Sequence, residues 1–185
     1  MMWMFHTATS FNGDISNWDV SSVDTMYDMF NGATSFNQPL NWNLSNGPDL
    51  GGMFYGATSF NQPLNHWNVS NVTNMNSMFM HASSFNQPLN DWNVGSVTHM
   101  AQMFSAATSF NQPLNDWDMS GGPVAAFMFV DATSFNQPLN DWDVSNITSL
   151  IQMFNGATSF NQPLSTWDVS SVTSMTDMLD NSALS

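Results

Sequence analysis

The side chains that could carry acid–base or ligand chemistry in this sequence are mainly aspartates. The chain has 14 acidic residues, all of them aspartate, and four histidines, but no lysine, arginine or cysteine, so its net charge is −14. Carboxylates without a cationic partner can attract a cationic protein or bind Ca²⁺ through their oxygen atoms. Nucleic acid is a poor partner, because phosphate binding depends on lysine and arginine.

Six aspartates flank a recurring tryptophan and are expected to point outward from neighbouring repeats. They are Asp91, Asp116, Asp118, Asp141, Asp143 and Asp168. If the repeats stack as strands do, like charges lie about 4.7–4.9 Å apart and repel one another. Three interpretations stay open: a solvated face, a contact for a cationic protein, or a weak Ca²⁺ site. We expect no other cofactor.

Catalysis and transition-metal binding are not indicated. The histidines, His6, His66, His81 and His99, occupy four different positions of the repeat and do not converge. No cysteine, lysine or glutamate is present to act as nucleophile or base, and no Ser-His-Asp order stands out from the repeat. We therefore predict that the chain is not an enzyme.

An internal repeat positions these side chains. Ser-Phe-Asn recurs seven times, with a spacing of 25 residues except for one interval of 24, and a tryptophan and a Met-Phe pair follow in step. We predict one domain over residues 1–185, made of seven repeats with partial repeats at both ends. Each unit is expected to contact only its neighbours.

The apolar spacing within one unit predicts a short strand and a short helix. Leu64, Trp67 and Val69 follow the strand pattern of leucine-rich repeats, with Trp67 and Val69 facing inward. The residues Val72–Phe79 have apolar side chains on one helical face. The predicted fold class is therefore α/β: a leucine-rich-repeat-like solenoid with one parallel strand and one helical turn per coil of about 25 residues.

Two further features of the repeat have structural interpretations. The asparagine after each Ser-Phe is expected to bond to turn backbone and to its equivalents in adjacent coils. Gly47-Pro48 and Gly122-Pro123 replace the usual Val-Thr in two units. That replacement indicates either tolerated drift or a contact point on the predicted helical side.

The two ends of the chain fall in mid-repeat and expose apolar side chains. The residues expected to stack against another copy are Trp3, Met4, Phe5, Met178 and Leu179. No apolar run approaches the length needed to span a membrane.

The residues 142–148, Trp-Asp-Val-Ser-Asn-Ile-Thr, and 153–160, Met-Phe-Asn-Gly-Ala-Thr-Ser-Phe, resemble the repeat of BspA-like surface proteins, a leucine-rich-repeat variant. The resemblance covers roughly residues 5–179. It implies a right-handed leucine-rich-repeat solenoid, an extracellular or cell-surface location, and adhesion or protein interaction.

The predicted function is thus a non-enzymatic interaction or adhesion scaffold that holds a protein or glycan at a cell surface. The alternative is a structural subunit that stacks end to end into an extracellular filament, since a head-to-tail contact that does not close produces an open assembly.

Overall fold

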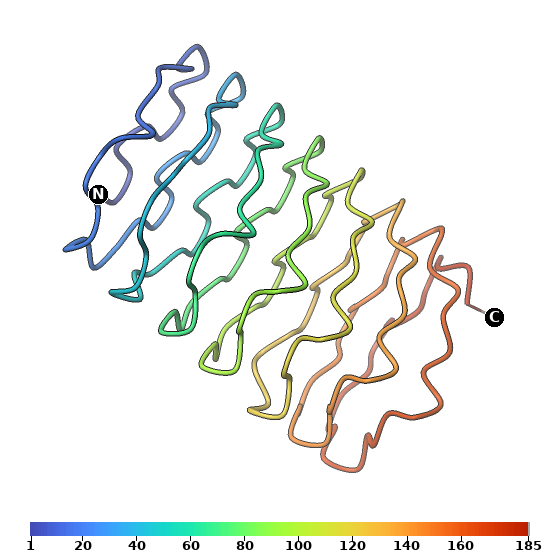
Figure 1. Ribbon diagram of the computed structural model, residues 1–185. Helices are drawn as coiled ribbons and strands as arrows, with labels where there is room; N and C mark the ends of the chain where they lie inside the picture. The colour runs from blue at the N-terminus through green and yellow to red at the C-terminus, as the bar shows by residue number, and fades with distance from the viewer. Residues whose placement is uncertain (185) are drawn as a thin grey trace.

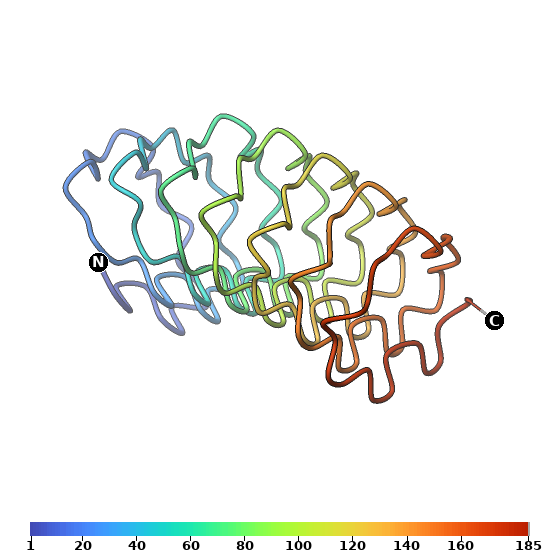
Figure 2. The same ribbon diagram turned by 90° about the horizontal axis from the view of Figure 1, so that it is seen from below.

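The computed structural model describes residues 1–184, and over these residues the chain winds as a stack of coils (Figures 1 and 2). Each coil lies against the coils before and after it, and the two termini lie at opposite ends of the stack (Figure 1). Hydrogen-bond partners in adjacent coils are 22 to 28 residues apart, as the repeat length requires.

The predicted fold class is wrong in its secondary structure. Residues 1–184 contain no helix, and their only sheet-type pairings are isolated parallel bridges between single residues. These bridges are Thr25–Asp49, Asn74–His99, His99–Val124 and Ser149–Ser174. The chain is therefore a stack of turns joined by irregular segments, and not an α/β solenoid.

Two consecutive turns replace the predicted helix at Val72–Phe79. The Met78 N–H donates to the Met75 carbonyl at 3.2 Å, and Ser77, just before Met78, has a φ of 54°. A positive φ at the third residue defines a type II turn. Another such turn follows, with His81 at a φ of 58°.

The N–H groups between these turn bonds point to the next coil, which prevents a helix. The Ser77 N–H donates to the Ala101 carbonyl at 2.8 Å, and the Phe79 N–H donates to the Met103 carbonyl at 2.9 Å. A helix would use these groups within its own segment. We call this side of the stack the turn face, residues 75–82 in one coil and their equivalents in the others.

The predicted strand around Trp67 is also absent, because the Leu64 carbonyl that a strand ladder would need already accepts other hydrogen bonds. The Leu64 carbonyl accepts the Trp67 N–H at 3.0 Å, which closes a turn, and the indole Nε1–H of Trp92 in the next coil, also at 3.0 Å. The inward direction of Trp67 and Val69 is confirmed, since both are buried, whereas His66 and Asn68 are exposed.

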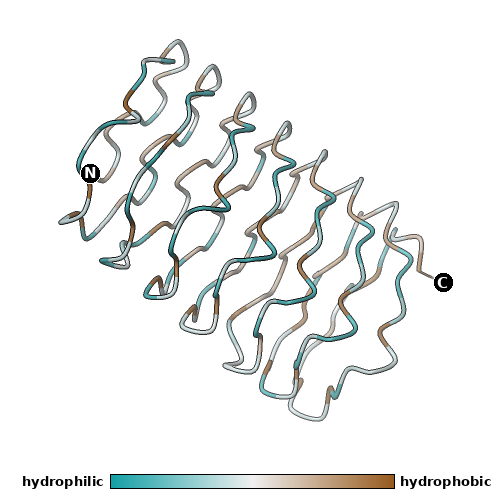
Figure 3. Ribbon diagram, in the orientation of Figure 1, coloured by the Kyte–Doolittle hydropathy of each residue, from teal (hydrophilic) through white to brown (hydrophobic). Residues whose placement is uncertain are grey.

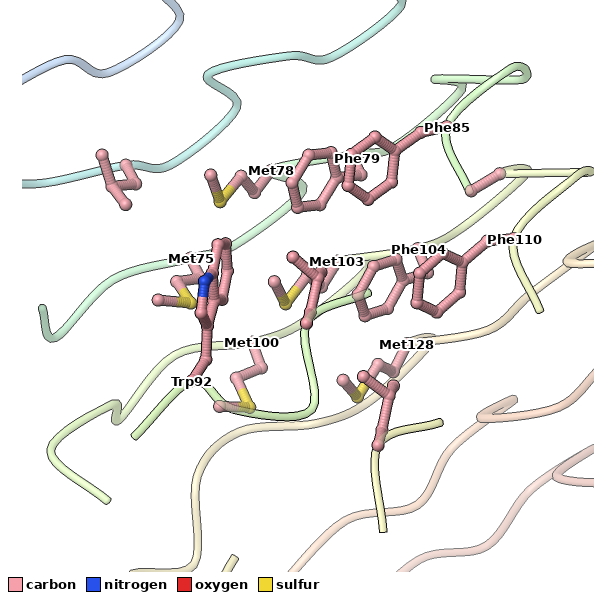
Figure 4. Close-up of a cluster of buried hydrophobic side chains, with 14 of the residues drawn as sticks. Met75, Met78, Phe79, Phe85, Trp92, Met100, Met103, Phe104, Phe110 and Met128 are labelled. Carbon is pink, nitrogen blue, oxygen red and sulfur yellow. The ribbon is translucent and has the colours of Figure 1, made fainter. Parts of the chain in front are cut away.

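The core consists of columns of like side chains that run through the stack. The ring centroid of Phe104 lies 5.7 Å from that of Phe79 and 5.6 Å from that of Phe129, in the two adjacent coils. It lies 4.1 Å from the ring centroid of Phe110 in its own coil. Figure 4 shows two such phenylalanine pairs beside a row of methionines. Apolar and polar residues alternate along each coil (Figure 3), so every coil adds one layer to a continuous apolar core.

The asparagine column joins adjacent coils, as predicted. The Asn86 Oδ1 accepts the backbone N–H of Asn111 and the Nε2–H of Gln112, both at 3.0 Å. The same pair of bonds joins Asn61 to Asn86 and Gln87. These side chains are used within the fold.

Candidate interaction surface

We call the six exposed aspartates predicted from the sequence the acidic line: Asp91, Asp116, Asp118, Asp141, Asp143 and Asp168. Their positions before and after each buried tryptophan place them on the outside of consecutive coils. They form two columns, one before the tryptophan and one after it.

Serine donors fix the carboxylates of the second column. The Asp143 Oδ1 accepts the Ser145 hydroxyl at 2.6 Å and the Ser145 backbone N–H at 3.0 Å. Asp118 is held in the same way by Ser120. Hydrogen bonds from a serine hydroxyl and backbone N–H lower the pKa of both aspartates below its ordinary value. These carboxylates therefore remain ionised at neutral pH.

Neighbouring carboxylates in this column repel one another. The charge of Asp143 acts to raise the pKa of Asp118 and of Asp168, but the serine hydrogen bonds outweigh this effect and the net shift of each pKa is downward. The column thus holds a row of negative charge that the fold itself stabilises in the ionised form.

In the first column, asparagines of the preceding coil hold Asp116 and Asp141. The Asp141 backbone N–H donates to the Asn115 Oδ1 at 3.1 Å, and the Asn115 side-chain amide donates to the Asp141 carboxylate. Asp116 pairs with Asn90 in the same pattern. Hydrogen bonds therefore orient five of the six aspartates, all but Asp91, and all six are exposed.

The other predicted candidates do not form a common site. In residues 1–184, no group of three or more histidines and aspartates is arranged to hold a metal ion. The histidines do not share partners; the Nε2 of His66 lies 3.0 Å from the Leu40 carbonyl oxygen, and the Nδ1 of His99 lies 2.8 Å from the Thr98 hydroxyl oxygen. No small-molecule pocket lies in the part of the chain described by the structure.

The predicted end residues differ in exposure. Trp3 and Met4 are 57% and 49% exposed, but Phe5 is half-buried against Phe11 and Phe30. At the other end, Met178 is buried and Leu179 is half-buried. Only the N-terminal end therefore exposes large apolar side chains from this predicted set.

The sequence did not predict an apolar patch on the turn face. We define the apolar patch as Val124, Phe127, Val130 and Ile151; Val124 is 49% exposed, and the other three are half-buried. The signal available in the sequence was the apolar run from Pro123 to Val130, which departs from the polar outward positions of other units.

These features define a repeat protein made of stacked turn-rich coils with a negatively charged outer surface. Residues 1–70, 40–125 and 124–184 match the family described as "Mycoplasma protein of unknown function, DUF285", and the chain belongs to this family. The three overlapping matches agree with the internal repeat. No curated protein and no solved structure matches the chain. In residues 1–184 there is also no helix that is long and apolar enough to cross a membrane.

Proposed function

We propose that the chain is a non-enzymatic interaction scaffold at a cell surface, and that the acidic line binds a cationic protein partner. The observation that carries this proposal is the row of oriented carboxylates on a chain without a single lysine or arginine. Because no internal cation neutralises these charges, an external cationic partner gains electrostatic attraction without displacing an internal ion pair.

The way the line is built supports this role. Since hydrogen bonds already orient the carboxylates, binding costs little side-chain entropy. The stack of coils repeats the same arrangement of carboxylates in several adjacent coils, which suits a partner with several lysine or arginine side chains. The resemblance of residues 142–148 and 153–160 to the BspA-like repeat supports a cell-surface location and an adhesion role.

A charge-neutralising variant tests the proposal. The variant D116N/D118N/D141N/D143N should keep the fold, because asparagine already occupies both columns in other coils, as at Asn41 and Asn68. The Asn68 Oδ1 accepts the Ser70 hydroxyl at 2.8 Å, as aspartate does in the later coils. The probe is a fluorescein-labelled Ser/Lys peptide, and its affinity is measured by anisotropy over a salt series.

A second variant with the same net charge provides the control. D24N/D28N/D177N/D180N removes four aspartates outside the acidic line. We expect the first variant to bind the peptide about tenfold more weakly than the control variant, with a shallower salt dependence. Equal affinity of the two variants would show that only net charge matters and would refute a specific role for the line.

A structural subunit is the second candidate, and the direction of the turn-face hydrogen bonds favours it. Each coil donates towards the next, from the Phe5 N–H to the Met29 carbonyl at 2.9 Å through to the Phe154 N–H and the Met178 carbonyl at 2.9 Å. If a second copy were placed end to end after the first, the Leu179 N–H of the first copy would meet the Met4 carbonyl of the second. Light scattering from purified chain tests this candidate; a monomer across the accessible concentration range would exclude it.

A further inference from the structure

The apolar patch consists of Val124, Phe127 and Val130 on the turn face of one coil, together with Ile151 of the next coil. Between Tyr27 and Val169, Val124 is the only large apolar side chain that is exposed. One coil later, the equivalents of Val124, Phe127 and Val130 are Ser149, Gln152 and Asn155. The backbone therefore does not require apolar residues at these three places.

The other Gly-Pro unit shows that the local turn does not require them either. Gly47-Pro48 is followed by Asp49 and Gly52 at the places that Val124 and Phe127 occupy. Both units have a glycine with positive φ before the proline, 69° at Gly47 and 64° at Gly122. At the places of Val124 and Phe127, the same turn is thus made with polar or small residues in one unit and with large apolar ones in the other.

The backbone of Phe127 is in the left-handed region, with a φ of 63°. This conformation is unfavourable for a bulky residue, and the equivalent places hold Gly52, Ser77, Gln102 and Gln152. A strained aromatic side chain on the surface, where smaller or polar residues fit the same backbone, indicates a role outside folding.

Carboxylates border the patch on both sides along the coil. Asp118 precedes the turn that leads to Val124, which is closed by the Gly122 N–H donating to the Met119 carbonyl at 3.0 Å. Asp131 directly follows Val130, and both aspartates are exposed. The surface thus presents an apolar centre between negative edges.

We infer that the apolar patch docks a segment of a partner protein that carries an apolar face flanked by lysine or arginine. Charge complementarity selects this occupant, because the negative edges of the patch match a cationic rim. A second copy of the chain is a poor occupant, since it has no lysine or arginine and each copy carries a net charge of −14. The inference deepens the proposed scaffold function and rests on it for a protein partner; it adds apolar contacts on the turn face and shares Asp118 with the acidic line.

The test compares two peptide probes on a variant built from the chain's own residues. V124S/F127Q/V130N installs the three residues found one coil later, so the fold should be kept and the strain at residue 127 reduced. The probes are an amphipathic Leu/Lys peptide and a Ser/Lys peptide of equal length and charge, each labelled with fluorescein. A Y27N/Y55N variant, which removes two other outward aromatic side chains, is the matched control.

We expect the unmodified chain to bind the Leu/Lys peptide about tenfold more tightly than the Ser/Lys peptide, which corresponds to roughly two buried methylene groups. V124S/F127Q/V130N should lose this preference, and Y27N/Y55N should keep it. A preference that survives in the patch variant, or is absent from the unmodified chain, would overturn the inference.

The remaining outcomes separate this inference from the proposed function and from other occupants. If the unmodified chain binds both peptides equally and loses both when the acidic line is neutralised, the scaffold function holds and the patch proposal fails. A dimer that dissociates in the patch variant, or patch-dependent binding to phosphatidylcholine vesicles, would assign the patch to a second copy or to lipid and would also overturn it.

Discussion

The glycines of the two Gly-Pro units offer a direct test of the turn geometry, and Gly122→Ala is the sharpest perturbation. Gly122 has a φ of 64°, and a Cβ atom added there would lie 2.4 Å from the Asn146 carbonyl oxygen and 2.8 Å from its carbon. These contacts are with backbone of the next coil, which cannot rotate away as a side chain can. The substitution must therefore move two coils apart or distort the turn.

The expected cost follows from two contributions. The left-handed conformation costs alanine roughly 1–2 kcal/mol relative to glycine. The overlap with the backbone adds about 1–3 kcal/mol, as for other insertions into packed sites. Gly122→Ala should therefore lower the free energy of unfolding by about 2–5 kcal/mol.

Gly56→Ala provides the control because it has nearly the same backbone without the overlap. Gly56 has a φ of 63°, but the nearest atoms to its added Cβ are those of Gly32 at 3.8 Å. Ala106 already occupies the equivalent place with a φ of 55°. The cost should be only about 1–2 kcal/mol.

Urea unfolding followed by tryptophan fluorescence measures both free energies. Gly122→Ala should have a clearly lower midpoint than Gly56→Ala. Equal midpoints would refute the close approach of adjacent coils at Gly122 and, with it, the reason for glycine in the Gly-Pro units.

Three further perturbations test the core, the asparagine column and the acidic line. Phe110→Ala removes a fully buried ring that lies 4.1 Å from Phe104, and it should cost about 3–5 kcal/mol in urea unfolding; a shift near zero would contradict the packed column. Asn86→Ala leaves two donors of the next coil without their acceptor and should cost about 1–3 kcal/mol by the same assay, whereas a neutral effect would mean that water replaces the bonds. Ser145→Ala should raise the pKa of Asp143 towards its ordinary value, which NMR titration of the carboxyl carbon measures; an unchanged pKa would contradict the serine bond as the main cause. Because the pKa of Asp143 is lowered in the folded state, ionised Asp143 stabilises the fold at pH values above its ordinary pKa of 3.8. This stabilisation is lost as the pH falls through the folded-state pKa, and Ser145→Ala should make the loss of stability in acid smaller.

The sequence predicted which residues are buried better than it predicted the backbone that buries them. Met75, Met78 and Phe79 have the spacing of a helical face, and all three are buried. Consecutive type II turns bury residues at almost the same spacing, so the apolar period alone cannot separate the two structures. The distinguishing signal was the recurring glycine at Gly32 and Gly56, which marks a left-handed turn position.

The strand prediction failed for a related reason. Leu64, Trp67 and Val69 alternate as a strand would, and the inward direction of the last two is correct. A ladder also needs free carbonyls, and the indole of Trp92 takes the Leu64 carbonyl from the next coil. A bond between residues 28 positions apart depends on how the coils stack and cannot be derived from the local pattern.

Function in this chain must be sought in departures from the repeat, because the repeated residues are used by the fold. The asparagines bond between coils, the tryptophans donate to carbonyls of preceding coils, and even the aspartates of the acidic line hold their own turns. The outward positions of the turn face accept different residue types, since Phe127 and Gln152 occupy equivalent places on equivalent backbone, even though Gln152 also bonds to Asp177 of the next coil. A substitution there changes the surface while the backbone of the coil is kept, so the apolar residues of one unit can bind a partner. Replacing them with the residues of the adjacent unit therefore tests binding separately from folding.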